Sequence, residues 1–209
     1  MGNPWNEIAL NDYERHMSLS SVLQLQTMNT EMKAQIGYYP AASIMILGVA
    51  GGNGLEHISE ERHSKIYGVD INASYLDSCV KRYPNLRDIF FPIQADLTKP
   101  NIRLPKADLV IANLVIEYIG YEAFQNVLNI VEPQYVSCVI QINKNDGFVS
   151  DSPYLHVFDG LNNVHHQLSE MELTNALEEI GYGDIYRSER LLPNGKALLR
   201  LDYSIPKST

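Results

Sequence analysis

The sequence predicts an α/β protein with a doubly wound, mostly parallel seven-stranded sheet that ends in an antiparallel hairpin, with extra N-terminal helices. Three observations support this fold. Between Ser43 and Ile142 short apolar runs alternate with helical patterns, as in parallel sheets covered by helices on both faces. Two further strand-like runs flank Asn194-Gly195, a strong hairpin signal. Ahead of the first strand, the segment Asn6–Gln35 has apolar residues at helical spacing.

The N-terminal segment is expected to form two helices that are additional to the sheet. The serine-rich stretch from Ser18 to Ser21 offers an N-cap for the second helix, and Gly37 with Pro40 is expected to end it. We therefore predict a helical lid over residues 1–40 and a main domain over residues 41–209. The residues at helical spacing are Leu10, Tyr13 and Met17, then Val22, Leu25, Met28, Met32 and Ile36.

The main domain reads as strands and helices in alternation. A long irregular stretch, Asn143–His166, separates the fifth strand from the last helix, where Ser169 and Glu172 have the spacing of a capping box. The expected strands are Ile44–Leu47, Ile66–Val69, Phe90–Gln94, Asp108–Ala112, Tyr135–Ile142, Gly183–Leu192 and Lys196–Ile205. The expected helices are Leu55–His63, Ser74–Arg82, Tyr121–Val131 and Ser169–Glu179.

Composition narrows the classes of partner. The chain has 209 residues, enough for one core, and a net charge of −9. Its 16 basic residues form no cluster, so we expect a small-molecule substrate rather than nucleic acid. We read no signal peptide and no membrane-spanning run, and we expect a cytoplasmic monomer or homodimer. Cys79 and Cys138 are predicted to be buried thiols.

The central feature is the turn from Gly48 to Gly54, which reads Gly-Val-Ala-Gly-Gly-Asn-Gly directly after the first strand. Glycine permits positive φ and lets a ligand approach bare backbone. Ligands of open α/β sheets bind beyond the carboxyl ends of the strands, where this turn lies. Alone, the turn is also compatible with a tight connection that binds nothing.

Two acidic residues follow consecutive strands. Asp70 ends the second strand, where a carboxylate can accept hydrogen bonds from both ribose hydroxyls of an adenosine. Asp96 follows the third strand, where it can accept from an adenine amino group. Each aspartate alone could simply cap a turn. Together with the glycine turn they indicate an adenosine-containing ligand.

From about Ser43 to Ile205 the chain resembles the class I methyltransferase family, which has a Rossmann-like fold and uses S-adenosylmethionine. The resemblance rests on the glycine turn, Asp70, Asp96, the motif Ala112–Val115 and the terminal hairpin. The chain departs from the family motif at two positions. Gly48 stands where the family usually has an acidic residue, and Ala50 stands where it has its first glycine. Asn53 or a residue of the N-terminal helices could replace the missing acid. The implied cofactor contacts are Gly48, Ala50, Gly52, Asn53, Gly54, Asp70, Ile71, Asp96, Leu97, Asn113 and Leu114.

Methyl transfer mainly requires alignment of donor and acceptor and exclusion of water, so the resemblance implies no fixed catalytic set. We predict catalytic roles for Tyr13, His16 and Glu117, in a transferase that acts on a small molecule by in-line transfer. Other residues expected on the acceptor side are Tyr154, His156, His165 and His166. We predict no metal site, because no further ligand completes the adjacent pair of histidines.

Two other functions remain open. A nicotinamide-dependent oxidoreductase would use a Gly-x-Gly-x-x-Gly turn, but His57 stands where its third glycine would be. A non-catalytic module that binds or senses S-adenosylmethionine is compatible with the loss of the acid at Gly48. Calorimetry with S-adenosylmethionine, S-adenosylhomocysteine and NAD separates these alternatives.

Overall fold

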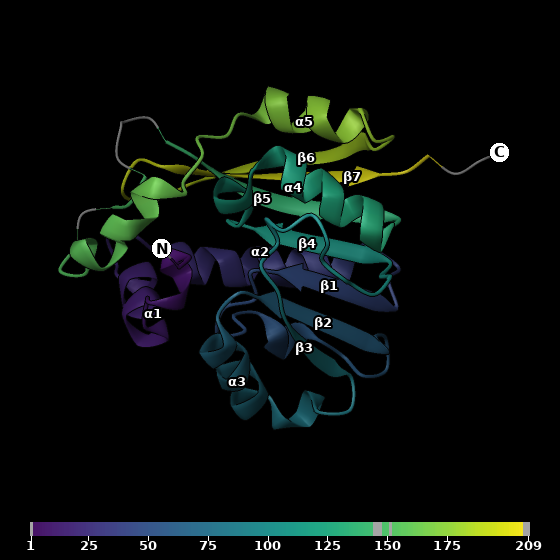
Figure 1. Cartoon of the computed structure of the whole chain (residues 1–209), viewed down its shortest axis with the longest axis horizontal. Helices are drawn as coiled ribbons and strands as arrows, with labels where there is room; N and C mark the ends of the chain where they lie inside the picture. The colour runs from purple at the N-terminus through teal and green to yellow at the C-terminus, as the bar shows by residue number, and fades with distance from the viewer. Residues whose placement is uncertain (1, 144–147, 151, 207–209) are drawn as a thin grey trace.

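A computed structural model describes residues 2–143, 148–150 and 152–206. Their strands form a single seven-stranded sheet (Figure 1). The strand order is β3-β2-β1-β4-β5-β7-β6. The first five strands in the chain pair in parallel, whereas β7 runs antiparallel to both β5 and β6. The predicted fold class is therefore confirmed. The strands are β1 (Ser43–Leu47), β2 (Lys65–Asp70), β3 (Phe90–Gln94), β4 (Leu109–Asn113), β5 (Tyr135–Ile142), β6 (Gly183–Leu191) and β7 (Ala197–Ser204).

Helices cover both faces of the sheet. One apolar cluster joins α2 and α3 to the strand residues of one face, and another joins α4 and α5 to the opposite face. Figure 1 shows α1 and the segment that contains η4 (green) together at one end of the sheet. The helices are η1 (Pro4–Asn6), α1 (Leu10–Ser18), α2 (Gln24–Tyr38), η2 (Leu55–His57), α3 (Ala73–Arg82), η3 (Pro84–Leu86), α4 (Ile116–Val131), η4 (Leu155–Asn163) and α5 (Glu170–Glu178).

The helix predicted over Leu55–His63 is wrong. Only one 3-10 turn, η2, forms there, and Ile58 is already extended with φ −70° and ψ 135°. The backbone amide of Ser59 then donates to Nδ1 of His63 at 3.2 Å, which folds the following residues into a turn. The face that such a helix would cover is filled by α2, whose Met32 and Ile36 pack against β1.

Two helix ends also differ from their predicted caps. The left-handed Leu23, with φ 52°, precedes α2 in place of a serine cap. The cause is a turn in which Leu23 N bonds to Leu19 O at 2.7 Å, and it sets where α2 begins. Ser169 caps α5 as predicted, but its own amide donates to the Tyr121 hydroxyl, so the capping box is incomplete.

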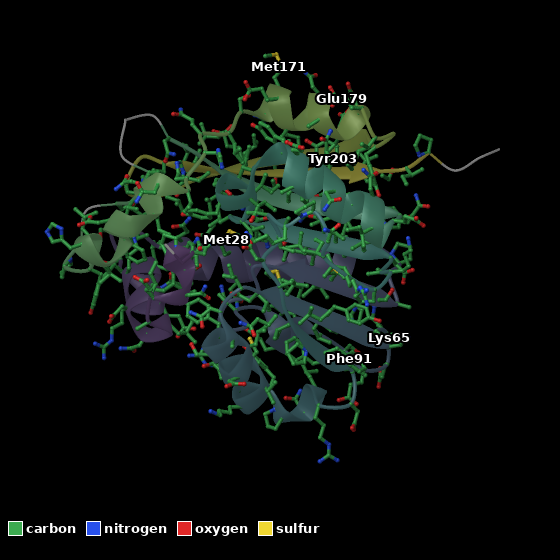
Figure 2. All side chains as sticks on the ribbon, in the orientation of Figure 1. Met28, Lys65, Phe91, Met171, Glu179 and Tyr203 are labelled. Atoms are coloured by element: carbon green, nitrogen blue, oxygen red, sulfur yellow. The ribbon has the colours of Figure 1, made fainter. Side chains whose placement is uncertain are left out.

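Buried polar contacts fasten α2 to the sheet. Gln35 exchanges hydrogen bonds with Asn113 on β4 and donates to Ser137 on β5. Near the middle of α2, Glu31 pairs with Arg190 and lies 3.8 Å from Arg200. In Figure 2, Met28 of α2 lies inside the molecule, whereas Met171 of α5 points outward. α2 is thus part of the core, while η1 and α1 lie beyond the strand ends.

The rest of the chain agrees in part with the predicted pattern. Cys79 and Cys138 are free and buried, as predicted. Helix α4 begins earlier than predicted and is interrupted by Gly120, with φ 78°. Within the irregular stretch Asn143–His166, residues 144–147 and 151 lie outside the described residues, and η4 occupies much of the remainder. No helix in the described part of the chain has the length and apolar character needed to cross a bilayer.

Candidate active site

The turn after β1 is held in place by hydrogen bonds that its backbone amides donate to residues of β2. Four of its residues have positive φ: Gly48 (66°), Ala50 (47°), Gly52 (84°) and Gly54 (95°). Gly48 N donates to Val69 O at 2.9 Å, and Ala50 N donates to Asp70 Oδ2 at 2.9 Å. The left-handed Ala50 therefore reproduces the backbone shape that glycine would otherwise supply, at the modest cost of a positive φ.

The sequence predicts Gly52 and Gly54 as cofactor contacts. The structure gives a packing reason for both glycines that requires no ligand. A Cβ at Gly54 would lie 2.6 Å from Met32 Cβ, and one at Gly52 would lie 2.8 Å from both Leu55 and Tyr83. These two positions are glycine because α2, η2 and Tyr83 pack against them. These two residues can contact a cofactor only through their backbone atoms.

A first cavity of about 660 Å³, which we call the donor cavity, opens beside this turn. It lies at the carboxyl ends of β1, β2 and β4, the usual ligand position in this type of sheet. Its lining residues are Asn3, Trp5, Tyr13, Gly48, Ala50, Asp70, Ile71, Tyr75, Ala95, Asp96, Leu97, Thr98, Asn113, Leu114, Val115, Tyr118 and Ile119.

Asp70 is the fixed acid of the donor cavity. Its side chain accepts from Ala50 N at Oδ2 and from Asn72 N at Oδ1, both at 2.9 Å, and the residue is 8% exposed. Burial raises the pKa of Asp70, and the backbone amides partly oppose this rise. Each carboxylate oxygen has a second lone pair, so the oriented group can still accept from two ligand hydroxyls.

Asp96 is held differently. Its Oδ1 accepts from Thr98 N at 3.1 Å and from Thr98 Oγ1 at 2.6 Å, while Lys99 Nζ lies 3.6 Å from Oδ2. These contacts form the turn-capping arrangement that the sequence left open as an alternative. Asp96 lines the donor cavity, and Oδ2 is the oxygen with capacity for a ligand.

A second cavity of about 560 Å³ adjoins the other side of the glycine turn, and we call it the turn cavity. Gly48 and Asn53 line it together with Glu14 from α1. Arg82 holds Glu14, with Nη2 donating to Oε2 at 2.8 Å. The amide of Asn53 is occupied, since it donates to Leu25 O at 2.9 Å. Glu14, from the N-terminal helix α1, therefore supplies a carboxylate to the cavity beside Gly48, where the acid of the family motif is missing.

The backbone at Gly48 disfavours the acid that the family motif usually has. A Cβ at this left-handed position would lie 3.1 Å from Val115 Cγ2. Asn113, predicted as a cofactor contact, uses its side-chain amide within the protein, where Gln35 binds both of its ends. Asn113 still lines the donor cavity and the turn cavity.

A third cavity of about 550 Å³, the acceptor cavity, lies under α1 and η4. Tyr13 and Leu114 line all three cavities, so the three spaces meet at these two residues. Leu114 reaches this position through a positive φ of 54°. The residues that line the acceptor cavity are Trp5, Tyr13, His16, Met17, Gln24, Leu114, Glu117, Tyr118, Gln141, Phe148, Val149, Ser150, Phe158, Leu161 and His165.

Glu117 is the buried acid of the acceptor cavity. The residue is 4% exposed, and its Oε1 accepts from Gln141 N at 2.8 Å. Its Oε2 is one of two buried side-chain polar atoms without a hydrogen-bond partner among the described residues. Burial raises the pKa of Glu117 to about 7. A carboxyl group of that pKa can take or release a proton near neutral pH.

The other titratable groups of the acceptor cavity are neutral at physiological pH. Burial lowers the pKa of His16, whose Nδ1 lies 2.8 Å from Ser152 Oγ. Burial also lowers the pKa of His165, whose ring stacks on Phe148 with centroids 3.9 Å apart. The pKa of Tyr13 is raised by its burial, so its phenol remains protonated.

Comparison with known proteins adds independent findings. Residues 46–134, from the glycine turn to the end of α4, match the family model described as a methyltransferase domain. The N-methyltransferase NodS from Bradyrhizobium japonicum WM9, solved with S-adenosylhomocysteine, superposes with a TM-score of 0.68 at 13% identity, over 99% of this chain and all (100%) of that one. No curated protein matches the sequence.

Two further solved structures share the fold. Magnesium protoporphyrin IX methyltransferase from Synechocystis PCC 6803, with S-adenosylmethionine bound, has a TM-score of 0.64 at 11% identity, covering 92% of this chain and 83% of that one. The [4+2]-cyclase SpnF has a TM-score of 0.65 at 9% identity, covering 87% and 82%. The family match and the geometry of the turn agree. Residues 46–134 thus match a methyltransferase domain, and the described chain has the fold of class I methyltransferases. Two of the neighbours named above were solved with S-adenosylmethionine or S-adenosylhomocysteine bound.

The residues present fit S-adenosylmethionine, because a buried, oriented aspartate and the backbone of the glycine turn line one cavity. Among the predicted cofactor contacts, Gly52 and Gly54 line none of the three cavities. The predicted catalytic residues Tyr13, His16 and Glu117 do meet around one cavity, with His165. His156 has a side chain that is 92% exposed, and His166 lines the surface beside α5; neither lines the acceptor cavity.

Most of the residues that line the acceptor cavity were not predicted from the sequence. Trp5 packs edge-on against Tyr118, with centroids 4.9 Å apart, and also against Tyr13. Phe158 lies over His16, and Gln24 donates to Gln141. One feature of the sequence could have indicated this wall. The single tryptophan of the chain, Trp5, lies in the N-terminal segment directly after Asn3-Pro4, where η1 begins.

Proposed function

We propose that this protein transfers the methyl group of S-adenosylmethionine to a small molecule held in the acceptor cavity, by in-line displacement. The observation that carries the proposal is the meeting of three cavities at Tyr13 and Leu114, with a buried acid in the donor cavity and another in the acceptor cavity. A donor and an acceptor bound on the two sides of this junction would be close enough to react without water between them.

Each part of the donor side has a role in the proposal. Asp70 would hold the ribose hydroxyls and Asp96 the adenine amino group, with Ile71 and Leu97 beside the base. The backbone of the turn from Gly48 to Gly54 would lie along the methionine part. Glu14 lines the turn cavity and is our candidate for the methionine amino group, in place of the acid missing at Gly48.

A small acceptor is favoured by the cavity that would hold it. The acceptor cavity of about 550 Å³ lies partly under α1 and η4, which restricts its size. The fold itself does not decide the acceptor. The three neighbours named above include an N-methyltransferase, a methyltransferase acting on a porphyrin and a cyclase. We retain the prediction of a cytoplasmic location as part of the proposal.

The test is a binding measurement followed by a turnover measurement. Titration calorimetry with S-adenosylmethionine and S-adenosylhomocysteine should show binding, and NAD should show none. Transfer of a labelled methyl group to a panel of small acceptors then tests catalysis. Absence of binding by both sulfur compounds would overturn the proposal. Binding without transfer to any acceptor would favour the non-catalytic module, with which the missing acid at Gly48 is compatible.

A further inference from the structure

Glu117 is a feature of the acceptor cavity that methyl transfer alone does not require. A buried carboxylate destabilises a protein unless hydrogen-bond donors surround it. Glu117 has one such donor, Gln141 N, and its second oxygen has none among the described residues. The neighbouring amide of Gln141 cannot help, because its side chain donates to Asn143 Oδ1 and Phe148 O instead. A ligand with a hydrogen-bond donor would complete the site.

The charge of the cavity indicates the sign of that ligand. Among the described lining residues, Glu117 is the only acidic or basic side chain apart from the two histidines. Those histidines have lowered pKa values and are neutral at physiological pH. The nearby Lys196 does not line the cavity, and its ammonium donates to Phe148 O. A cationic group is therefore favoured beside Glu117, and a carboxylate ligand is disfavoured.

The remaining walls favour a flat apolar body. Trp5 packs edge-on against both Tyr13 and Tyr118, and Phe148 stacks on His165, so several rings surround the cavity. Aromatic faces attract ammonium groups as well as other rings. The combination of rings with one buried carboxylate matches an amine better than an alcohol, because an ammonium group adds charge attraction to the hydrogen bond that an alcohol also offers.

We infer that the acceptor is a small primary or secondary amine on a flat apolar or aromatic body, and that Glu117 binds its nitrogen and accepts its proton. The inference rests on the proposed function. It makes Glu117 a catalytic residue, with His16 and His165 as neutral walls of the site.

Atoms and charges balance in the inferred methyl transfer. The amine enters as an ammonium ion, and one N–H proton passes to the Glu117 carboxylate, which leaves a nitrogen lone pair. That lone pair forms the new N–C bond as the C–S bond of the donor breaks, and its electron pair goes to sulfur. The products are S-adenosylhomocysteine and the methylated ammonium ion, and Glu117 later releases its proton to water.

The test uses matched ligands on the full chain saturated with S-adenosylhomocysteine. Phenethylamine, phenethyl alcohol and hydrocinnamate share one ring; tryptamine, tryptophol and indolepropionate share a larger one. Binding is followed by calorimetry, and methyl transfer with labelled S-adenosylmethionine. We expect the amines to bind most tightly, and Glu117→Gln to weaken amine binding roughly 10- to 100-fold while changing alcohol binding little. Glu122→Gln, an exposed glutamate on the same helix, is the matched control.

Several results would overturn the inference. These are tighter binding of the alcohols or acids, no binding by any amine of either series, or equal amine binding by Glu117→Gln and the unchanged protein. Binding of S-adenosylhomocysteine is measured first in every variant. If that binding is absent in the unchanged protein, the proposed function fails; if it is present and the amines fail, only this inference does.

Discussion

The donor and acceptor cavities meet at Tyr13 and Leu114, yet they are built in different ways. The key acid of the donor cavity, Asp70, ends a central strand and is held by two backbone amides. The acceptor cavity is closed by η1, α1 and η4, which lie outside the sheet. Strand ends are fixed by sheet pairing, whereas peripheral segments can vary without changing it. Under the proposed function, the sheet would fix the donor and the added segments would select the acceptor.

The largest effect is expected from Asp70→Asn. The variant keeps one oxygen acceptor but loses the charge and an acceptor for a ribose hydroxyl, so affinity for S-adenosylhomocysteine should fall about 1,000-fold. Calorimetry measures the change, and Asp77→Asn on the exposed side of α3 is the control. Affinity equal to that of the unchanged protein would show that Asp70 only supports the turn.

Glu117→Gln should change how the stability of the ligand-free protein depends on pH. Burial raises the pKa of Glu117 from 4.5 to about 7. Between these values the folded protein keeps a proton that the unfolded chain has released, so stability falls as pH rises through this window and stays lower above it. Glutamine does not titrate. The stability of the variant relative to the unchanged protein should therefore increase by about 3 kcal/mol from pH 4 to pH 8.

Urea unfolding at the two pH values measures that difference. His16, His165, Tyr118 and Lys196 face or lie near this carboxyl group, but they titrate in both proteins and largely cancel. A stability difference that stays constant with pH would mean that Glu117 does not titrate in this range.

Glu14→Gln tests whether the turn cavity belongs to the donor side. We expect affinity for S-adenosylmethionine to fall about tenfold, because a charged contact to the amino group is lost. Methylthioadenosine lacks that amino group and should bind both proteins equally. Glu7→Gln, exposed in the same N-terminal segment, is the control. Equal losses for both ligands would instead point to damage to the Arg82 contact and the turn.

The smallest effect is expected from Asp96→Asn. Oδ1 keeps its bonds from Thr98, so only one acceptor for the adenine amino group is lost at a partly exposed position. A weakening of about threefold in affinity for S-adenosylhomocysteine is expected. A loss as large as that of Asp70→Asn would mean that the two aspartates contribute equally, contrary to the difference in their burial.

The sequence was sufficient for the sheet because its signals are local. Apolar runs located the first five strands, and Asn194-Gly195 located the hairpin of the last two, with Gly195 at φ 79°. The helix after the turn was mispredicted because the space is taken by α2, a contact distant in sequence. The acceptor wall was missed for the same reason: Trp5, Gln141 and Phe158 meet only after the chain has folded.

The packing of α2 also bears on the order of folding. Met28 lies in one apolar cluster with Val139 on β5 and Leu198 on β7, and Glu31 pairs with Arg190 on β6. An early helix thus gains part of its contacts only when the last hairpin has been made. Contacts of such long sequence separation slow folding and leave apolar side chains exposed in the meantime. During synthesis, this helix would be exposed to aggregation or chaperone binding until β6 and β7 emerge.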